Sequence, residues 1–181
     1  MKKNNKNQQK AKANKSKNEF PFYEKNCFTV STGAGSLIST STDISTSLLK
    51  ASRLTGLQAI FDEGRINKVV YRLKPRYTMS TIGQVALYIE RDTSDSIATT
   101  TELAASNFEA VVNHVSKTQV ITWLPQEPAD REFQSLGSFT SLGFFGVVAS
   151  DQIADQSKTG QSNAVIYDAV VESWWTVRGR P

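Results

Sequence analysis

Hydrophobic and polar residues alternate with a period of two over residues 66–77, which is the pattern of a half-buried β-strand. Val69, Tyr71 and Leu73 fall on one side of this segment. The opposite side is mostly basic and carries Lys68, Val70, Arg72, Lys74 and Arg76. The pattern therefore predicts a strand with an apolar face toward the core and a basic outer face.

Five other segments have strand character, namely residues 27–30, 83–91, 119–124, 143–150 and 164–177. In the second of these, Val85, Leu87 and Ile89 are expected to face inward, and a polar turn follows. In the last, one face carries Val165, Tyr167, Ala169, Val171, Trp175 and Val177. No strand is predicted in the Ser/Thr/Gly-rich stretch 31–47.

Two segments show helical spacing instead. Over residues 48–61, one face carries Leu54, Leu57 and Phe61, and Gly64 is expected to terminate the helix. A second helix is predicted over residues 107–115, where Ser106 and Glu109 match a capping box. Its apolar residues recur at i, i+3, i+4 and i+7: Phe108, Val111, Val112 and Val115.

The order of these elements indicates the fold class. Many strands with short helices between them, and no repeating βα alternation, favour an all-β sandwich over a parallel-sheet nucleotide-binding fold. A chain of 181 residues is long enough for one such domain with a sizeable core. The expected domain comprises residues 20–181.

Residues 1–19 form a separate lysine-rich arm. The first eighteen residues contain seven lysines, no acid and no aromatic or β-branched residue, so the arm is expected to be disordered when free. Because the whole chain is +4, this +7 segment leaves −3 for the remainder. The charge therefore predicts a polyanionic partner, with nucleic acid first and anionic lipid second. The arm lysines are Lys2, Lys3, Lys6, Lys10, Lys12, Lys15 and Lys17.

The lysines can meet successive phosphates without a fixed geometry, and on a single strand they predict a log–log salt slope of about −5. A tail that only aids solubility is the weaker interpretation. The basic strand face of Lys68, Arg72, Lys74 and Arg76 could extend the nucleic-acid surface onto the domain. A solvated face, or ion pairs between subunits, would explain these four residues equally well.

The chain offers little chemistry for catalysis. Cys27 and His114 are the only cysteine and histidine, which excludes an intrachain disulfide and a Cys/His zinc site. No phosphate-binding glycine motif is complete, and the Gly33–Gly35 segment is interpreted as a loop. No apolar run reaches the ~20 residues of a membrane span. We therefore expect a protein that is not an enzyme and has no membrane partner.

Two features suggest contacts with other molecules. Asp92 and Asp95 place two carboxylates in one turn, where they could bind Ca²⁺ or simply hydrogen-bond the turn backbone. Trp174 and Trp175 are adjacent, so on a strand they face opposite ways. Trp175 is expected in the core, and Trp174 at the surface suggests a subunit interface.

The run from Ser52 to Asp95 resembles the shell domain of tombusvirus and sobemovirus coat proteins. The matching parts are the short helix, the FDEGRI junction at 61–66, the basic strand ending in Pro75, the G-x-V-x-L strand from Gly83 and the D-x-x-D turn. The same jelly roll is similar to coat proteins of satellite viruses and some circular single-stranded DNA viruses. The ending YDAVVESWWTVRGRP resembles their final strand.

The resemblance implies a single eight-stranded antiparallel jelly-roll β-sandwich with short inserted helices. It also implies an icosahedral homo-oligomer with the basic arm inside the shell, a viral single-stranded nucleic acid as partner, and Ca²⁺ between subunits at Asp92 and Asp95. Such a protein resides in the virion, and in the host cytoplasm during assembly. The short chain favours the smallest icosahedral shell.

Two other functions fit parts of the sequence. A non-viral β-sandwich nucleic-acid-binding module could use the same arm, but it would need a basic groove or stacking aromatics on a body of net −3. A carbohydrate-binding or hydrolytic sandwich would need a cleft with paired acids. Glu127, Asp130 and Glu132 are clustered, although Pro125 and Pro128 favour a surface turn there.

Overall fold

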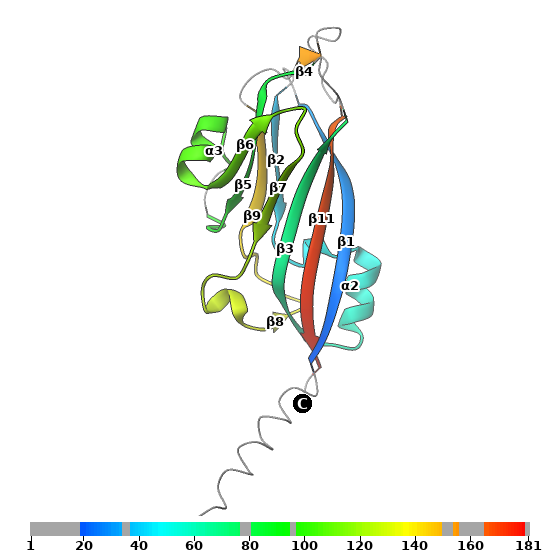
Figure 1. Cartoon of the computed structure of the whole chain (residues 1–181). Helices are drawn as coiled ribbons and strands as arrows, with labels where there is room; N and C mark the ends of the chain where they lie inside the picture. Colours follow the sequence, from blue (N-terminus) through cyan, green and yellow to red (C-terminus); the bar gives the residue numbers. More distant parts are fainter. Residues whose placement is uncertain are drawn as a thin grey trace, which may run out of the picture.

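The computed structural model describes residues 19–33, 37–76, 81–94, 97–149, 154–155 and 165–179, which form two packed antiparallel sheets (Figure 1). The first sheet has the order β1-β11-β3-β7, and the short β8 (Gln134–Ser135) also pairs with β3. Its strands are β1 (Glu19–Ser31), β11 (Val165–Arg178), β3 (Glu63–Pro75) and β7 (Gln119–Trp123).

The second sheet has the order β2-β9-β5-β6. Its strands are β2 (Ile38–Asp43), β9 (Phe144–Ala149), β5 (Gln84–Glu90) and β6 (Glu109–His114). The short strands β4 (Thr81–Ile82) and β10 (Ala154–Asp155) pair separately. Because the chain crosses repeatedly between the sheets β1-β11-β3-β7 and β2-β9-β5-β6, the fold is the predicted eight-stranded jelly roll.

Large apolar side chains fill the space between the sheets. Trp123, Trp175, Tyr71, Tyr167 and Phe145 are fully buried, each contributing up to about 3 kcal/mol through removal of its surface from water. The Tyr167 hydroxyl donates to the Val115 carbonyl oxygen at 2.7 Å, so its polar end is satisfied inside the core. The predicted inward faces of β3, β5 and β11 are confirmed, with Trp175 in this core.

The first predicted helix is present in a shorter form. A 3₁₀ turn (Thr46–Leu48) precedes α2 (Ala51–Gln58), and Leu54 and Leu57 pack against the core as expected. Gly64 does not terminate it. This glycine lies buried in β3, where an added Cβ would come within 2.8 Å of a terminal methyl group of Leu136.

The prediction of a second helix over residues 107–115 is wrong. Residues 109–114 form strand β6, and the helix α3 (Thr101–Asn107) lies just before it. Thr100 caps α3, its hydroxyl accepting from the Leu103 N–H at 3.0 Å, so the Ser106–Glu109 capping box does not operate. Apolar residues at 108, 111, 112 and 115 fit helical spacing, but the run is rich in β-branched valines and pairs with β5.

Helix α3 covers the outer side of the second sheet, where a second apolar cluster forms. Ala86, Tyr88, Phe144 and Val148 are buried there, with Phe108 stacked on Tyr88. Strand β5 is therefore buried on both faces, which its sequence did not indicate. A further 3₁₀ turn, η3 (Ala129–Arg131), lies in the loop after β7.

One unpredicted strand and one strand boundary also differ from the prediction. Strand β2 lies inside the Ser/Thr/Gly-rich stretch where no strand was predicted, and it pairs with β9 through its backbone. Strand β1 begins at Glu19, which pairs with Arg178 and so belongs to the sandwich rather than to the arm. The arm lysines, Asp95 and the centre of the Gly33–Gly35 loop lie outside the described residues.

Candidate nucleic-acid and assembly surfaces

The outer side of the first sheet, here called the open face, is solvent-facing. Among the described residues, no α-helix lies across it, in contrast to the second sheet with α3 (Figure 1). Neighbouring residues of β1, β11 and β3 form rows across it. The rows are Tyr23–Trp174–Lys68, Lys25–Glu172–Val70, Cys27–Val170–Arg72 and Thr29–Asp168–Lys74.

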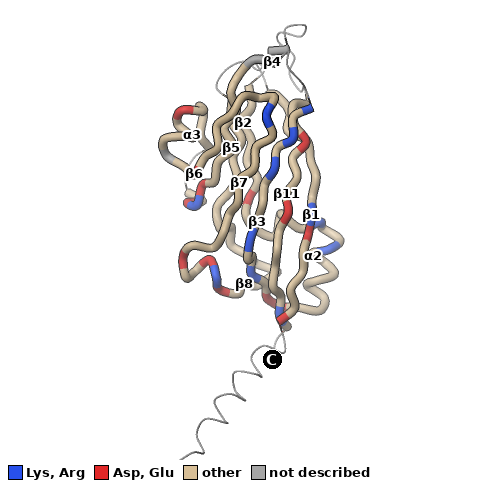
Figure 2. The backbone as a smooth tube through the Cα atoms, in the orientation of Figure 1, with Lys and Arg blue, Asp and Glu red and all other residues tan. Residues whose placement is uncertain are grey.

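Positive charge is concentrated on this face, and Figure 2 shows the Lys and Arg residues following β3 beside acids of β11. Seven basic residues and four acidic ones give it a net charge of +3, on a body whose total is −3. The basic residues are Lys25, Arg65, Lys68, Arg72, Lys74, Arg76 and Arg178, and the acidic ones are Glu19, Glu63, Asp168 and Glu172.

The four predicted basic residues therefore lie together on one surface, and most have partners within the chain. Arg72 Nη1 lies 3.1 Å from Glu172 Oε2, and Arg76 Nη2 lies 2.6 Å from Asp168 Oδ1. Lys74 lies opposite Asp168 across the sheet. Sequence analysis missed these acids of β11, because only the strand register places them beside β3.

The carboxylates on this face are stabilised in their charged form. The hydrogen bond from the Tyr23 hydroxyl, followed by that from Arg72, holds the pKa of Glu172 below its usual value of 4.5. The hydrogen bond from Arg76 likewise lowers the pKa of Asp168. The two acids therefore stay ionised at neutral pH and keep the nearby arginines in place.

Trp174 lies on the open face, on the side of β11 opposite to the buried Trp175, as its position in the strand predicted. Its ring centroid is 5.2 Å from that of Tyr23, and the Lys68 ammonium nitrogen lies 5.0 Å from the Trp174 centroid. Tyr23 is 42% exposed. The face thus combines aromatic rings and cations, and the contribution of β1 was missed from the sequence.

The first residue of β1 forms an ion pair with β3. Arg65 Nη2 lies 3.6 Å from Glu19 Oε2, and Arg178 Nε hydrogen-bonds Glu63 at 2.5 Å. Both guanidinium groups contact the Phe133 ring, at 4.6 and 4.0 Å from its centroid. The Arg65–Glu19 ion pair therefore joins the first residue of β1 to β3.

The acidic turn after β5 holds only one described member of the predicted calcium pair. Asp92 is exposed, and its Oδ1 accepts hydrogen bonds from the Ser94 N–H at 2.8 Å and the Ser94 hydroxyl at 2.7 Å. These bonds lower the pKa of Asp92. Asp92 therefore hydrogen-bonds its own turn.

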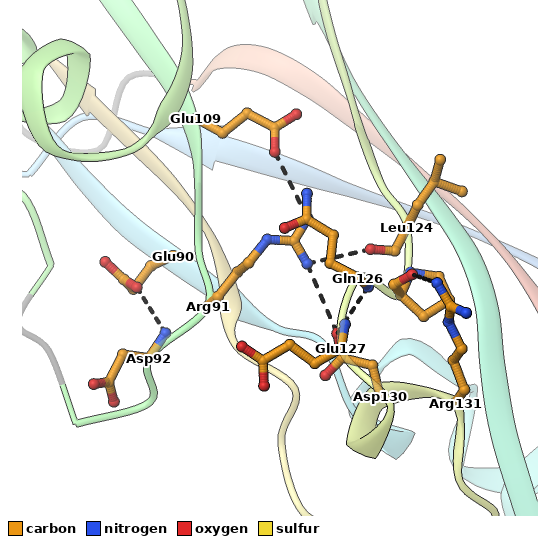
Figure 3. Close-up of polar contacts among 10 residues, drawn as sticks. Glu90, Arg91, Asp92, Glu109, Leu124, Gln126, Glu127, Asp130 and Arg131 are labelled. Carbon is orange, nitrogen blue, oxygen red and sulfur yellow. Dashed lines mark hydrogen bonds and ion pairs between the residues drawn. The ribbon is translucent and has the colours of Figure 1, made fainter.

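Further acids surround Arg91 beside this turn (Figure 3). Arg91 Nη2 lies 3.7 Å from Glu109 Oε2, and its Nη1 lies 4.0 Å from Asp130 Oδ2 and donates to the Leu124 carbonyl oxygen at 3.2 Å. Asp130 also accepts from two loop N–H groups, so it orders the loop after β7. Within the described ranges, no group of three or more His, Cys, Asp or Glu residues could hold a metal ion.

The single histidine has a local structural role. His114 is exposed at the end of β6, and its Nδ1 accepts from the Ser116 N–H at 3.2 Å and lies 2.8 Å from the Ser116 hydroxyl oxygen. It thus belongs to the turn into β7. No helix in the described part of the chain is long and apolar enough to cross a bilayer.

Comparison with known proteins finds the same architecture in viral shells. No protein-family model matches the chain, and no curated protein matches its sequence. Its structure matches the capsid of Macrobrachium rosenbergii nodavirus, from the giant freshwater prawn, with a TM-score of 0.66 and 19% identity over 92% of this chain and 96% of that one. The chain has the fold of a viral capsid shell domain.

Two other capsids match this jelly roll equally well. Mud crab tombus-like virus gives a TM-score of 0.70 with 16% identity, over 90% of this chain and 91% of that one. Cocksfoot mottle virus gives 0.69 with 14% identity, over 91% and 85%. The resemblance to tombusvirus and sobemovirus shell domains is therefore confirmed for the fold. The match covers about nine-tenths of this chain.

Proposed function

We propose that the chain is a capsid protein of a small icosahedral virus, a structural protein rather than an enzyme. The observation that carries this proposal is the match of about nine-tenths of the chain to capsid proteins whose own chains are covered almost completely. The described residues between Glu19 and Gly179 form the jelly roll that such a role requires. The protein would reside in the virion, after assembly in the host cytoplasm.

The particle would be built from copies of this chain alone. The capsid protein of Penaeus vannamei nodavirus, a further structural match, has been solved as both T=1 and T=3 particles.

The packaged molecule would be single-stranded nucleic acid. The lysine-rich arm supplies +7 and the open face +3, whereas the rest of the body is acidic. Fully extended, eighteen residues reach ~60 Å, which is enough to cross from a shell lining into a small lumen. The arm would therefore condense the nucleic acid, and Lys68, Arg72, Lys74 and Arg76 would line the cavity behind it.

Calcium between subunits is part of the proposal. Asp92 and Asp95 would each supply carboxylate oxygens, and because Ca²⁺ takes six to eight oxygens, a neighbouring subunit would supply others. Chelation should then swell or dissociate wild-type particles, as measured by dynamic light scattering. The Asp92→Asn variant should lose this response, whereas Glu127→Gln, at a nearby exposed acid, should keep it.

The direct experiment is negative-stain electron microscopy of the purified full-length protein, with the ratio of absorbance at 260 and 280 nm of the same fraction. Uniform closed particles with a nucleic-acid spectrum are expected. A nucleic-acid-free monomer that persists across salt and calcium conditions would contradict the proposal. A monomer that binds nucleic acid would instead support the non-viral binding module, which the charge of the open face favours.

A further inference from the structure

We infer that Tyr23 and Trp174 form a stacking platform for the bases of single-stranded nucleic acid on the open face. The inference rests on the proposed function, to which it adds a base-contacting site beside the phosphate-binding lysines. Neither residue was among the nucleic-acid-binding residues expected from the sequence, because they come from β1 and β11, at opposite ends of the described chain.

The Tyr23 ring is held in place by a hydrogen bond, and the Trp174 ring packs beside it. The Tyr23 hydroxyl donates to Glu172 Oε1 at 2.9 Å, and Arg72 Nη1 donates to Glu172 Oε2 at 3.1 Å. Both carboxylate oxygens of Glu172 are therefore occupied, one by the ring and one by the guanidinium. A ring fixed in this way loses little conformational entropy when a ligand stacks on it.

Cations lie beside the rings. Lys68 lies over the Trp174 ring, and its long side chain can swing aside so that a base takes its place while the ammonium meets a phosphate. Lys25 and Arg72 lie in the next rows along the sheet. Aromatic rings interleaved with cations are the arrangement by which single-stranded nucleic acid is bound without sequence preference.

The surroundings favour nucleic acid over another protein as the occupant. The face is net +3, and Arg72 and Arg76 already neutralise its central acids, so a protein partner would have to be acidic. The remainder of a second copy is acidic in total, but the arm of every copy joins β1 of this same sheet. Nucleic acid held by the arms is thereby brought to the face that carries the rings.

The tryptophans provide a specific readout. Of the three in the chain, Trp123 and Trp175 are fully buried, so Trp174 is the one that a stacked base can quench. The test titrates dissociated full-length subunits with oligouridylate and with an abasic oligonucleotide of equal length. Oligouridylate should quench the fluorescence, and the abasic strand, which the arm binds through its phosphates alone, should not.

The affinity of variants provides the second measurement, at a salt concentration high enough to weaken binding by the arm. Tyr23→Leu and Trp174→Leu should each weaken oligouridylate binding about tenfold, which lies within the range for loss of one stacking contact. The matched variant Trp174→Phe keeps a ring and should bind within about twofold of wild type. Tyr23→Phe keeps its ring but loses the hydrogen bond to Glu172, so its affinity should lie between those of wild type and Tyr23→Leu. Unfolding by urea checks that all four variants are folded.

Equal quenching by both oligonucleotides, or leucine variants that bind like wild type, would overturn the inference. So would a Trp174 that is shielded from acrylamide in nucleic-acid-free particles, since that result places it in a subunit interface. These outcomes are separate from the proposed function: particles that package nucleic acid without quenching would refute only the platform. Subunits that show quenching but never assemble would refute only the capsid.

Discussion

Gly146 lies in the middle of β9, directly opposite Tyr88 of β5, and the Tyr88 ring occupies the space where a side chain would be. The ring position matters because the Tyr88 hydroxyl accepts from the Ala98 N–H at 2.8 Å and the ring stacks on Phe108. A single hydrogen in place of a methyl group thus allows the sheet and the segment before α3 to pack together.

Gly146→Ala should therefore destabilise the protein by about 1–3 kcal/mol, the usual cost of overpacking a tight interior. Urea unfolding of dissociated subunits measures the change. Gly56→Ala is the matched control: Gly56 lies in α2 with open space around it, so alanine should stabilise the helix by up to ~1 kcal/mol. Equal stability of wild type and Gly146→Ala would show that the ring moves freely.

Glu172 links stability to pH on the open face. Because its pKa is lowered in the folded chain, its ionised form is stabilised by folding. That contribution is fully present above the usual glutamate pKa of 4.5 and is lost as the pH falls through the lower folded value. Glu172→Gln should therefore be less stable than wild type at pH 7, and the difference should shrink at acidic pH.

The measurement is the free energy of unfolding in urea at pH 7 and at pH 3. Glu127→Gln, at an exposed acid outside the open face, is the control and should show a smaller pH-dependent difference. A gap between Glu172→Gln and wild type that stays constant over this range would mean that Tyr23 and Arg72 do not stabilise the carboxylate.

At the scale of elements, the lysine-rich arm and the sandwich should be separable. Deleting residues 2–17 removes no apolar side chain that the core uses, so the shortened chain should fold with unchanged thermal stability but fail to package nucleic acid. A variant with all seven lysines changed to glutamine keeps the length and should fail in the same way. Normal packaging by either variant would contradict the role of the arm.

Strands β3 and β11 of the first sheet could be predicted from the sequence because each has one buried face and alternates visibly. Only residues 27–30 of β1 were predicted. Strand β2 could not be predicted, since its serines and threonines pair with β9 through the backbone and only Ile38 is deeply buried. The run from Phe108 to Val115 satisfies both helical and strand spacing, and pairing with β5 decides between them. Tertiary contacts of this kind leave no local pattern.

Only the part of the candidate site that lies on a single strand could be predicted from the sequence. The basic side of β3 appears in the alternation of a single strand, so Lys68, Arg72, Lys74 and Arg76 could be identified together. Their acidic partners and the Tyr23 ring come from strands that are distant in sequence, and only the register of β1, β11 and β3 brings them into one surface. Charge composition alone therefore overestimates how many basic residues lack an acidic partner within the chain.

In the whole molecule, the net charge differs among three regions: the arm, the open face and the remainder of the body. The arm is +7, the open face is +3 and the body as a whole is −3, so the surface away from the open face is distinctly acidic. An arrangement with the arm and open face inside a shell places the positive charge against nucleic acid. The acidic surfaces then face neighbouring subunits and solvent, which keeps particles from aggregating.

This arrangement predicts how the protein responds to trypsin. In dissociated subunits the arm lysines should be cleaved quickly, because that segment has no aromatic or β-branched residue with which to pack. In closed particles the same bonds should be protected, since the protease cannot enter the shell. Mass spectrometry after timed digestion measures the rate at each lysine, and particles opened by chelator serve as the control. Rapid cleavage in intact particles would place the arm outside the shell, where its charge could not hold a packaged strand.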